Sequence, residues 1–184
     1  MILKDLHIDN TWTLFLDRDG VINKKLEDDY VKHTSEFEFI DGTLNALRML
    51  NSIFGNIVVV TNQQCIGKRI IFPEDLELIH QNMLYEINYL KGRIDKVYYS
   101  PYLASENHPT RKPDIGMALQ AQKDFPAIDF SKSIIVGDSL SDMEFGRNAG
   151  MKTVYISNEA KADDRIDFNF KSLIYFAHTL TTKQ

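Results

Sequence analysis

The sequence predicts an α/β fold in which helices cover both faces of a doubly wound, mostly parallel sheet. Short apolar runs rich in β-branched residues recur along the chain, and stretches with the apolar period of a helix lie between most of them. Such alternation is typical of right-handed βαβ units. With 184 residues, 43% of them hydrophobic, the chain is long enough to bury one substantial core. We therefore expect residues 1–184 to form a single domain.

Six apolar runs predict the strands, in order along the chain. They cover residues 11–16, 57–60, 94–99, 133–136, 153–156 and 167–170. A first helix is expected after Asp41, a candidate N-cap, and a second begins at Pro73, which suits a first turn. A third helix is expected after Asp114, and a fourth covers residues 140–148 and is closed by Gly150.

Residues 23–39 interrupt this alternation between the first strand and the first helix. The segment is polar and shows no helical or strand period. A long insertion at this place predicts a flap over the end of the sheet, and a polar loop without a role is the alternative.

Composition and charge limit the possible functions. A net charge of -5, with no basic run longer than two residues, argues against partners such as nucleic acid or an anionic membrane surface. No apolar stretch approaches the length of a bilayer span. The N-terminal residues lack the pattern of a secretory signal, and the single Cys65 cannot form an internal disulfide, so we expect a cytoplasmic protein. We expect a monomer because no apolar surface stripe is evident.

Polar and charged side chains lie where the predicted strands end or the next helix begins. They are Asp17 and Asp19, Thr61 and Asn62, Arg111 and Lys112, and Asp138 and Asp142. Each pair alone has an ordinary explanation: a turn, a solvated pair of cations, or a helix N-cap at Asp138. The carboxyl ends of parallel strands form the ligand crevice of an open α/β sheet, so we expect the four pairs to meet at one edge.

Carboxylates and cations that meet in this way suit phosphoryl transfer. Asp17 or Asp19 could be a nucleophile that forms an aspartyl-phosphate, with the other as acid/base. Mg²⁺ prefers oxygen ligands and keeps several waters, so ligands from Asp17, Asp19 and Asp138 would suffice.

The neighbouring groups suit the phosphate itself. Lys112 would bind the equatorial phosphoryl oxygens, while Thr61 and Asn62 would donate hydrogen bonds without adding charge. The predicted chemistry is therefore magnesium-dependent hydrolysis of a phosphate ester.

The chain also resembles the haloacid dehalogenase superfamily of phosphatases. Four motifs appear in the order of that superfamily: Asp17-x-Asp19-Gly20, Thr61-Asn62, Lys112-Pro113 and Gly137-Asp138-x-x-x-Asp142. Among its branches, the chain is most similar to the D,D-heptose 1,7-bisphosphate phosphatases and the histidinol-phosphatases. The resemblance implies a capless, Rossmann-like domain that cleaves one phosphate from a small phosphorylated sugar.

The resemblance also implies roles for individual residues. Asp17 would be the nucleophile and Asp19 the acid/base, with Lys112 as a further catalytic residue. Mg²⁺ would be held by Asp17, by the carbonyl of Asp19 and by Asp138. The phosphate-binding residues would be Thr61, Asn62, Gly20 and Arg111, and Arg111 would grip the phosphate that is not removed.

Three departures from the pattern of these relatives are visible. Relatives usually carry a Cys-x-His and Cys-x-Cys zinc loop, whereas residues 100–102 and 108–110 here are Ser-Pro-Tyr and His-Pro-Thr, so we expect no structural zinc. Gln64-Cys65 replaces the usual Ser-Gly, which places a Cβ in a turn that often favours glycine. Ser139 replaces a lysine, which removes a cation near the expected metal.

Four functions are in competition. The leading hypothesis is hydrolysis of D-glycero-D-manno-heptose 1,7-bisphosphate, and the residue that favours a bisphosphate is Arg111. Hydrolysis of histidinol phosphate or another small sugar phosphate is the first alternative, and a polynucleotide 3′-phosphatase ranks below it because the charge balance supplies no basic groove. A catalytically silent sugar-phosphate-binding protein is the alternative of another class.

Overall fold

A computed structural model describes residues 2–181 of the chain. Its six strands form one parallel sheet in the order β3-β2-β1-β4-β5-β6, which confirms the doubly wound prediction. The strands are β1 (Thr13–Leu16), β2 (Asn56–Asn62), β3 (Lys96–Ser100), β4 (Ser133–Gly137), β5 (Lys152–Ile156) and β6 (Phe168–Phe170). Each of the six predicted runs overlaps one of them.

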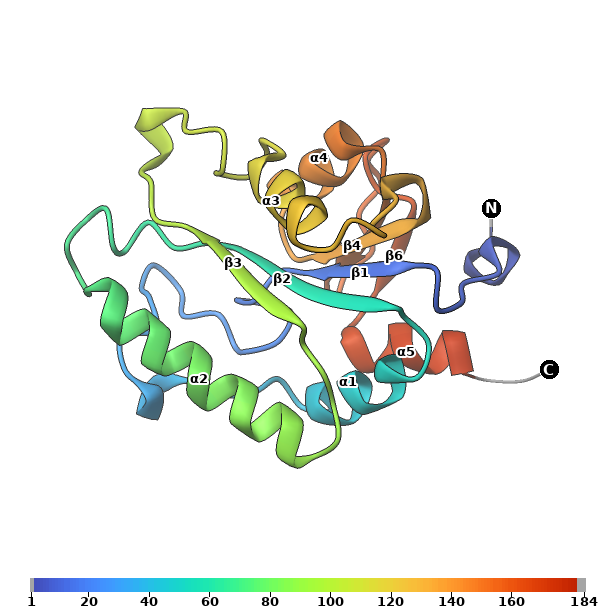
Figure 1. Cartoon of the computed structure of the whole chain (residues 1–184), viewed down its shortest axis with the longest axis horizontal. Helices are drawn as coiled ribbons and strands as arrows, with labels where there is room; N and C mark the ends of the chain where they lie inside the picture. The colour runs from blue at the N-terminus through green and yellow to red at the C-terminus, as the bar shows by residue number, and fades with distance from the viewer. Residues whose placement is uncertain (1, 182–184) are drawn as a thin grey trace.

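Helices cover the sheet on both faces, with α1, α2 and α5 on one side and α3 and α4 on the other (Figure 1). The α-helices are α1 (Thr43–Asn51), α2 (Pro73–Tyr89), α3 (Gly116–Asp124), α4 (Leu140–Ala149) and α5 (Leu173–Thr181). Four short 3-10 helices are η1 (Leu3–Leu6), η2 (Thr34–Glu36), η3 (Ala104–Glu106) and η4 (Phe130–Lys132). The sequence predicted the first four α-helices and missed α5.

Alternate residues of the strands face the two helical layers. Leu14 and Leu16 of β1 belong to the core shared with α1, α2 and α5, whereas Phe15 belongs to the core shared with α3 and α4. All three side chains are fully buried. A central strand buried on both faces reads as a continuous apolar run, which is the pattern that predicted it.

The predicted N-cap at Asp41 and the alternative explanation of Asp138 as an N-cap are both wrong. Helix α1 is preceded by Gly42 with a φ of 83°, so glycine and not Asp41 occupies the N-cap position. Helix α4 is capped by Ser139, whose side chain accepts the backbone N–H of Asp142, so Asp138 is not the cap. Pro73 does begin α2, and Gly150 ends α4 in the left-handed region.

Residues 23–39 lie beside the carboxyl ends of the central strands. Their two ends are joined by a bridge between Asn23 and Phe39, and η2 is the regular structure within them. Val31 is buried, and Lys25 and Tyr30 line the cavity at the end of the sheet. The segment thus forms part of the wall of that cavity, and its role as a flap stays a prediction. Among the described helices, none combines the length and apolar character needed to cross a membrane.

Candidate active site

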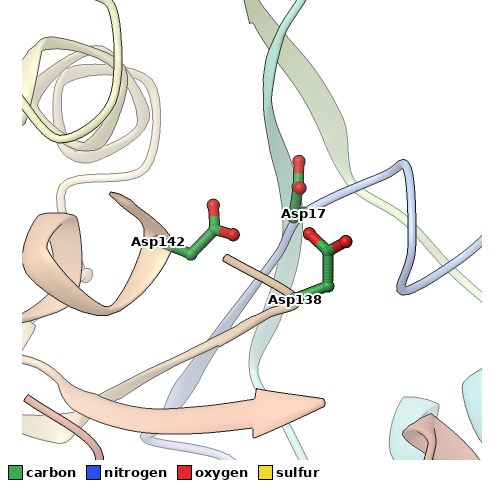
Figure 2. Close-up of side chains that lie close together, drawn as sticks. All are labelled: Asp17, Asp138 and Asp142. Atoms are coloured by element: carbon green, nitrogen blue, oxygen red, sulfur yellow. The ribbon is translucent and has the colours of Figure 1, made fainter. Parts of the chain in front are cut away.

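Three buried or partly buried carboxylates meet at the carboxyl edge of the sheet. Asp17 follows β1 and Asp138 follows β4, and the register pairs Leu16 of β1 with Val136 of β4. Asp142 lies in the first turn of α4. Each of the three offers an oxygen within 4.8 Å of the others, and Figure 2 shows their carboxylates turned toward one region. The sequence predicted this convergence from the positions of the strand ends.

Lys112 joins this cluster from the segment after β3. Its Nζ lies 2.8 Å from Asp17 Oδ1 and 2.6 Å from Asp142 Oδ1, and it donates to the carbonyl of Val60 at 2.7 Å. Burial alone opposes the charge of this ammonium, but Asp142 and Asp17 outweigh burial and hold the pKa of Lys112 above its usual value. All three N–H donors therefore have acceptors, and the cation is held against Asp17.

Burial also changes the titration of the carboxylates. Burial raises the pKa of Asp17 to about 7, aided by Asp142 and Asp138 and opposed by Lys112. Burial likewise raises the pKa of Asp138, although the ammonium of Lys25 acts in the opposite direction. The cluster thus carries more negative charge than Lys112 and Lys25 fully compensate.

The cluster fits a divalent cation. Asp138 Oδ1 is buried and has no hydrogen-bond partner, and the donor set consists of carboxylate oxygens. Mg²⁺ favours such oxygens and would supply the missing charge. We predicted Asp17 and Asp138 as ligands, and the structure brings them together. The third carboxylate is Asp142, whereas the side chain of Asp19 lies outside the group.

The carboxylate of Asp19 instead accepts hydrogen bonds from three side chains. Arg18 Nη2 lies 2.9 Å from both carboxylate oxygens, and Asn23 and Gln63 donate at 2.9 and 2.8 Å. Burial would raise the pKa of Asp19, but Arg18 and these hydrogen bonds outweigh it and place the pKa below its usual value. In this arrangement Asp19 is an ionised carboxylate.

Sequence reasoning missed the group that supports Arg18. The guanidinium is buried, and its Nη1 lies 3.1 Å from Nε2 of His80 in α2. Since arginine only donates, His80 accepts through Nε2. Burial, with Arg18 as the second cause, lowers the pKa of His80 to about 3, so this ring is neutral. No local signal marks the pair, because 62 residues separate its members.

Two predicted phosphate-binding residues, Gly20 and Asn62, make hydrogen bonds to the backbone in this structure. The N–H of Gly20 donates to the carbonyl of Asn23 at 2.8 Å, so it is not free for a phosphate. Gly20 has a φ of 89°, and a Cβ there would lie 2.2 Å from Asp138 Oδ2, which explains the glycine. Asn62 bridges the backbone of Lys112, accepting its N–H at 3.0 Å and donating to its carbonyl at 3.1 Å. It therefore positions Lys112.

The departures at Ser139 and Cys65 have local explanations. Lys25 of the flap donates to Asp138 Oδ2 at 2.8 Å, so a cation does face Asp138 although residue 139 is a serine. Cys65 is buried, and its Sγ lies 3.5 Å from Gln63 Oε1. Neither Gln64 nor Cys65 has a positive φ, so a Cβ is accommodated in this turn.

A cavity of about 260 Å³ opens over the cluster. The predicted residues Asp17, Asp19, Asp138, Thr61, Asn62, Arg111 and Lys112 all line it. Lys25 and Tyr30 of the flap complete its wall. The arrangement offers a buried carboxylate beside an ammonium, oxygens that could hold a divalent cation, and cationic side chains for an anionic substrate, which together suit phosphate-ester hydrolysis.

Known proteins are similar to this chain in sequence and in fold. The family model described as polynucleotide kinase 3 phosphatase matches residues 13–181. A D-glycero-alpha-D-manno-heptose-1,7-bisphosphate 7-phosphatase from Mycobacterium bovis is 36% identical over 170 residues, covering 90% of each chain. An enzyme of the same name from Campylobacter jejuni is 37% identical over 163 residues, covering 89% of this chain and 92% of the other. The chain belongs to the D,D-heptose 1,7-bisphosphate phosphatase family of the haloacid dehalogenase superfamily.

A solved structure agrees with the architecture of this phosphatase. The D,D-heptose 1,7-bisphosphate phosphatase from B. bronchiseptica, complexed with magnesium and phosphate, superimposes with a TM-score of 0.83 at 24% identity. The match covers 92% of this chain and 97% of the other. The resemblance inferred from the four motifs is confirmed, as are the fold class and the assignment as a phosphatase. Phosphatases of this superfamily use Mg²⁺, and the acidic cluster can hold such an ion.

Proposed function

We propose that this phosphatase removes the 7-phosphate of D-glycero-D-manno-heptose 1,7-bisphosphate through an aspartyl-phosphate on Asp17. The observation that carries the proposal is the contact of buried Asp17 with Lys112 beneath a cavity lined by further cations. The names of the two relatives support the substrate and the phosphate that is removed. Both relatives are named for the alpha anomer, which we take as the preferred one.

In the first step, a carboxylate oxygen of Asp17 attacks phosphorus and the bond from phosphorus to the sugar oxygen breaks. Asp19 gives its proton to that leaving oxygen. In the second step, Asp19 takes a proton from water, whose oxygen attacks phosphorus and releases inorganic phosphate and the Asp17 carboxylate. Lys112 orients Asp17, because its three donors are directed to Asp17, Asp142 and Val60.

Asp17, Asp138 and Asp142 would hold Mg²⁺, together with the carbonyl of Asp19 that the family pattern implies. The ion supplies charge neutralisation between the carboxylates and the phosphate. The support for this set is the group of converging oxygens and the unpartnered Asp138 Oδ1.

The side chain of Asp19 must leave its present hydrogen-bond donors before it can act as an acid. Arg18, Asn23 and Gln63 favour its ionised form, in which it has no proton to give. We propose that its side chain rotates toward the cavity when substrate enters, which frees it from these donors and raises its pKa.

Arg111 would hold the phosphate that stays on the sugar. Its Nη1 donates to the carbonyl of Tyr102 at 3.1 Å, and the residue lines the cavity beside Asn62 and Lys112. A guanidinium fixed at one nitrogen keeps its remaining donors for a bidentate contact with phosphate. This need for a second anion separates a sugar bisphosphate from histidinol phosphate.

The proposal is tested by Mg²⁺-dependent phosphate release from a panel of substrates. The panel holds both anomers of the heptose bisphosphate, histidinol phosphate, a 3′-phosphorylated oligonucleotide and p-nitrophenyl phosphate, with Asp17→Asn as the blank. We expect the highest kcat/KM for the alpha anomer of the bisphosphate and no release by Asp17→Asn.

Each other outcome has a defined meaning. Preference for histidinol phosphate or the oligonucleotide keeps the chemistry and overturns the substrate. Binding of the bisphosphate without release above the blank would favour the silent binding protein.

A further inference from the structure

The segment between β3 and α3 brings both Arg111 and Lys112 to the site. It runs from the end of β3 at Ser100 to the start of α3 at Gly116, and η3 at its tip is largely exposed. Figure 1 shows this segment as a long excursion from the end of β3. A loop of this length needs internal contacts to hold a side chain at a fixed place.

Four side chains at the base of this excursion contact one another. The rings of Tyr102 and His108 stack with centroids 3.4 Å apart and planes 13° apart. Thr110 Oγ1 lies 2.8 Å from His108 Nδ1 and 3.2 Å from Ser100 Oγ. We call Ser100, Tyr102, His108 and Thr110 the clasp, because they join the start of the excursion to its end.

The directions of the hydrogen bonds within the clasp follow from one backbone donor. The backbone N–H of Thr110 donates to His108 Nδ1 at 3.3 Å, so this nitrogen is an acceptor. The hydroxyl of Thr110 then donates to the same nitrogen, and its oxygen accepts from Ser100. These hydrogen bonds link Ser100, Thr110 and His108 without an ion pair.

The clasp is connected directly to Arg111. Arg111 Nη1 donates to the carbonyl of Tyr102 at 3.1 Å, and its backbone N–H donates to the carbonyl of His108 at 2.8 Å. Both stacked residues therefore fix Arg111, one at its guanidinium and one at its backbone. Tyr102 itself does not line the cavity over the carboxylates.

By the resemblance described above, the four clasp positions correspond to those at which relatives usually carry zinc ligands, and the residues here do not fit zinc. They offer no thiolate, and Nδ1 of the single imidazole is already an acceptor for Thr110. Within residues 2–181, the one group of candidate ligand side chains that meets the geometry of a metal site is Asp17, Asp138 and Asp142.

We propose that the clasp is a metal-free device that positions Arg111 for the phosphate retained on the substrate. Tyr102, His108 and Thr110 are positioning residues, and they act through the placement of the Tyr102 carbonyl and the Arg111 backbone. The inference rests on the proposed function, because it assigns Arg111 a second phosphate.

The first test compares Tyr102→Ala with Tyr102→Phe. The phenylalanine variant keeps the stacked ring and serves as the matched control. We expect Tyr102→Ala to raise KM for the heptose bisphosphate by about tenfold, the scale of one lost hydrogen bond to a charged group. Its kcat, and its KM for p-nitrophenyl phosphate, should stay near the values of the unmodified protein, as should all constants of Tyr102→Phe. An equal change in KM for both substrates would overturn the proposal.

A double-mutant cycle separates positioning from general loosening of the loop. In an Arg111→Ala background, Tyr102→Ala should raise KM for the bisphosphate no further, since the group that it positions is gone. Fully additive effects would contradict the proposal. Thr110→Val, which removes one hydroxyl at nearly constant shape, provides the same comparison if Tyr102→Ala does not fold.

The metal-free character is tested on the purified protein. Inductively coupled plasma mass spectrometry should find far less than one zinc atom per chain. A zinc-selective chelator in excess Mg²⁺ should leave KM for the heptose bisphosphate unchanged. Stoichiometric zinc whose removal raises KM would overturn this part.

Hydrogen exchange distinguishes failure of the inference from failure of the proposed function. If the unmodified protein releases no phosphate from the bisphosphate, the proposed function fails and the role assigned to Arg111 fails with it. If release occurs, Tyr102→Ala should speed exchange of the amide of residue 111 relative to Tyr102→Phe. Unchanged exchange at this amide would overturn the clasp while the proposed function stands.

Discussion

The carboxylate cluster and the clasp lie at the same edge of the sheet and hold their members together in opposite ways. The cluster gathers Asp17, Asp138 and Asp142, with a raised pKa at the first two and an unpartnered oxygen at Asp138. The clasp instead joins Ser100, Thr110 and His108 through hydrogen bonds and contains no carboxylate. The difference teaches that a buried group of like charges needs a cation, whereas a network of hydroxyl and imidazole groups can be held together by its own hydrogen bonds.

The largest expected effect comes from removing one carboxylate of the cluster. Asp138→Asn should lower kcat/KM on the order of 10³-fold, because the ion that stabilises the transferring phosphate loses a charged ligand. It should also reduce the rise in Tm that Mg²⁺ gives the unmodified protein. Asp114→Asn, an exposed acid near the same edge, is the control and should retain both. Full activity of Asp138→Asn would remove Asp138 from the metal site.

Removing the buried cation should destabilise the same cluster. Lys112→Met leaves Asp17 and Asp142 buried without their partner, and we expect the free energy of unfolding to fall by about 3–5 kcal/mol. Urea unfolding with and without Mg²⁺ measures the loss, part of which the ion should restore. Lys25→Met is the matched control: its side chain is 56% exposed, so we expect a loss of at most about 1 kcal/mol. Equal losses in the two variants would show that burial does not set the cost.

His80 tests whether a neutral group can support a buried charge. Its folded pKa of about 3 lies below the usual value of 6.5, so the unfolded chain binds a proton first as pH falls. Stability from this site should thus be present at neutral pH and decline from about pH 6.5 downward. Between pH 7 and pH 5 the unmodified protein should lose roughly 2 kcal/mol more than His80→Gln, whose amide can still accept from Arg18. Parallel urea titrations at both pH values decide this, and identical losses would contradict a buried neutral ring.

The smallest expected effect belongs to the clasp. Thr110→Val removes the hydroxyl that links His108 and Ser100, and we expect a loss of about 1 kcal/mol in the free energy of unfolding. Ser105→Ala, at the exposed tip of the same excursion, is the control. Urea unfolding should give the same loss for Thr110→Val with and without Mg²⁺. A loss that Mg²⁺ reverses would mean that the two regions are not independent.

The fold was predictable wherever burial left a periodic pattern. The central strands are apolar on both faces, and α2 begins with a proline that only a first turn accommodates. Helix α5 escaped prediction because Leu173, Ile174, Tyr175, Phe176 and Ala177 are consecutive nonpolar or aromatic residues and give little contrast between faces. The cap of α1 was placed one residue early, since a glycine with positive φ replaces the usual polar cap.

The candidate site was predictable where it depends on strand ends. Asp17 and Asp138 follow adjacent strands, so topology alone brings them together. The partners that come from elsewhere were not predictable: Lys25 meets Asp138 across 113 residues. The roles of Gly20 and Asn62 also required the structure, because an N–H or an amide that suits a phosphate equally suits the backbone beside it.

The contact between Lys25 and Asp138 gives the flap a second property. The ammonium of Lys25 binds Oδ2 of the carboxylate whose other oxygen has no partner. A divalent ion bound by Asp138 would repel this ammonium, because both are positively charged. Binding of the ion is therefore expected to weaken the contact by which Lys25 ties the flap to Asp138. A fluorophore attached to residues 23–39 is therefore expected to gain mobility when a divalent ion occupies the carboxylate cluster.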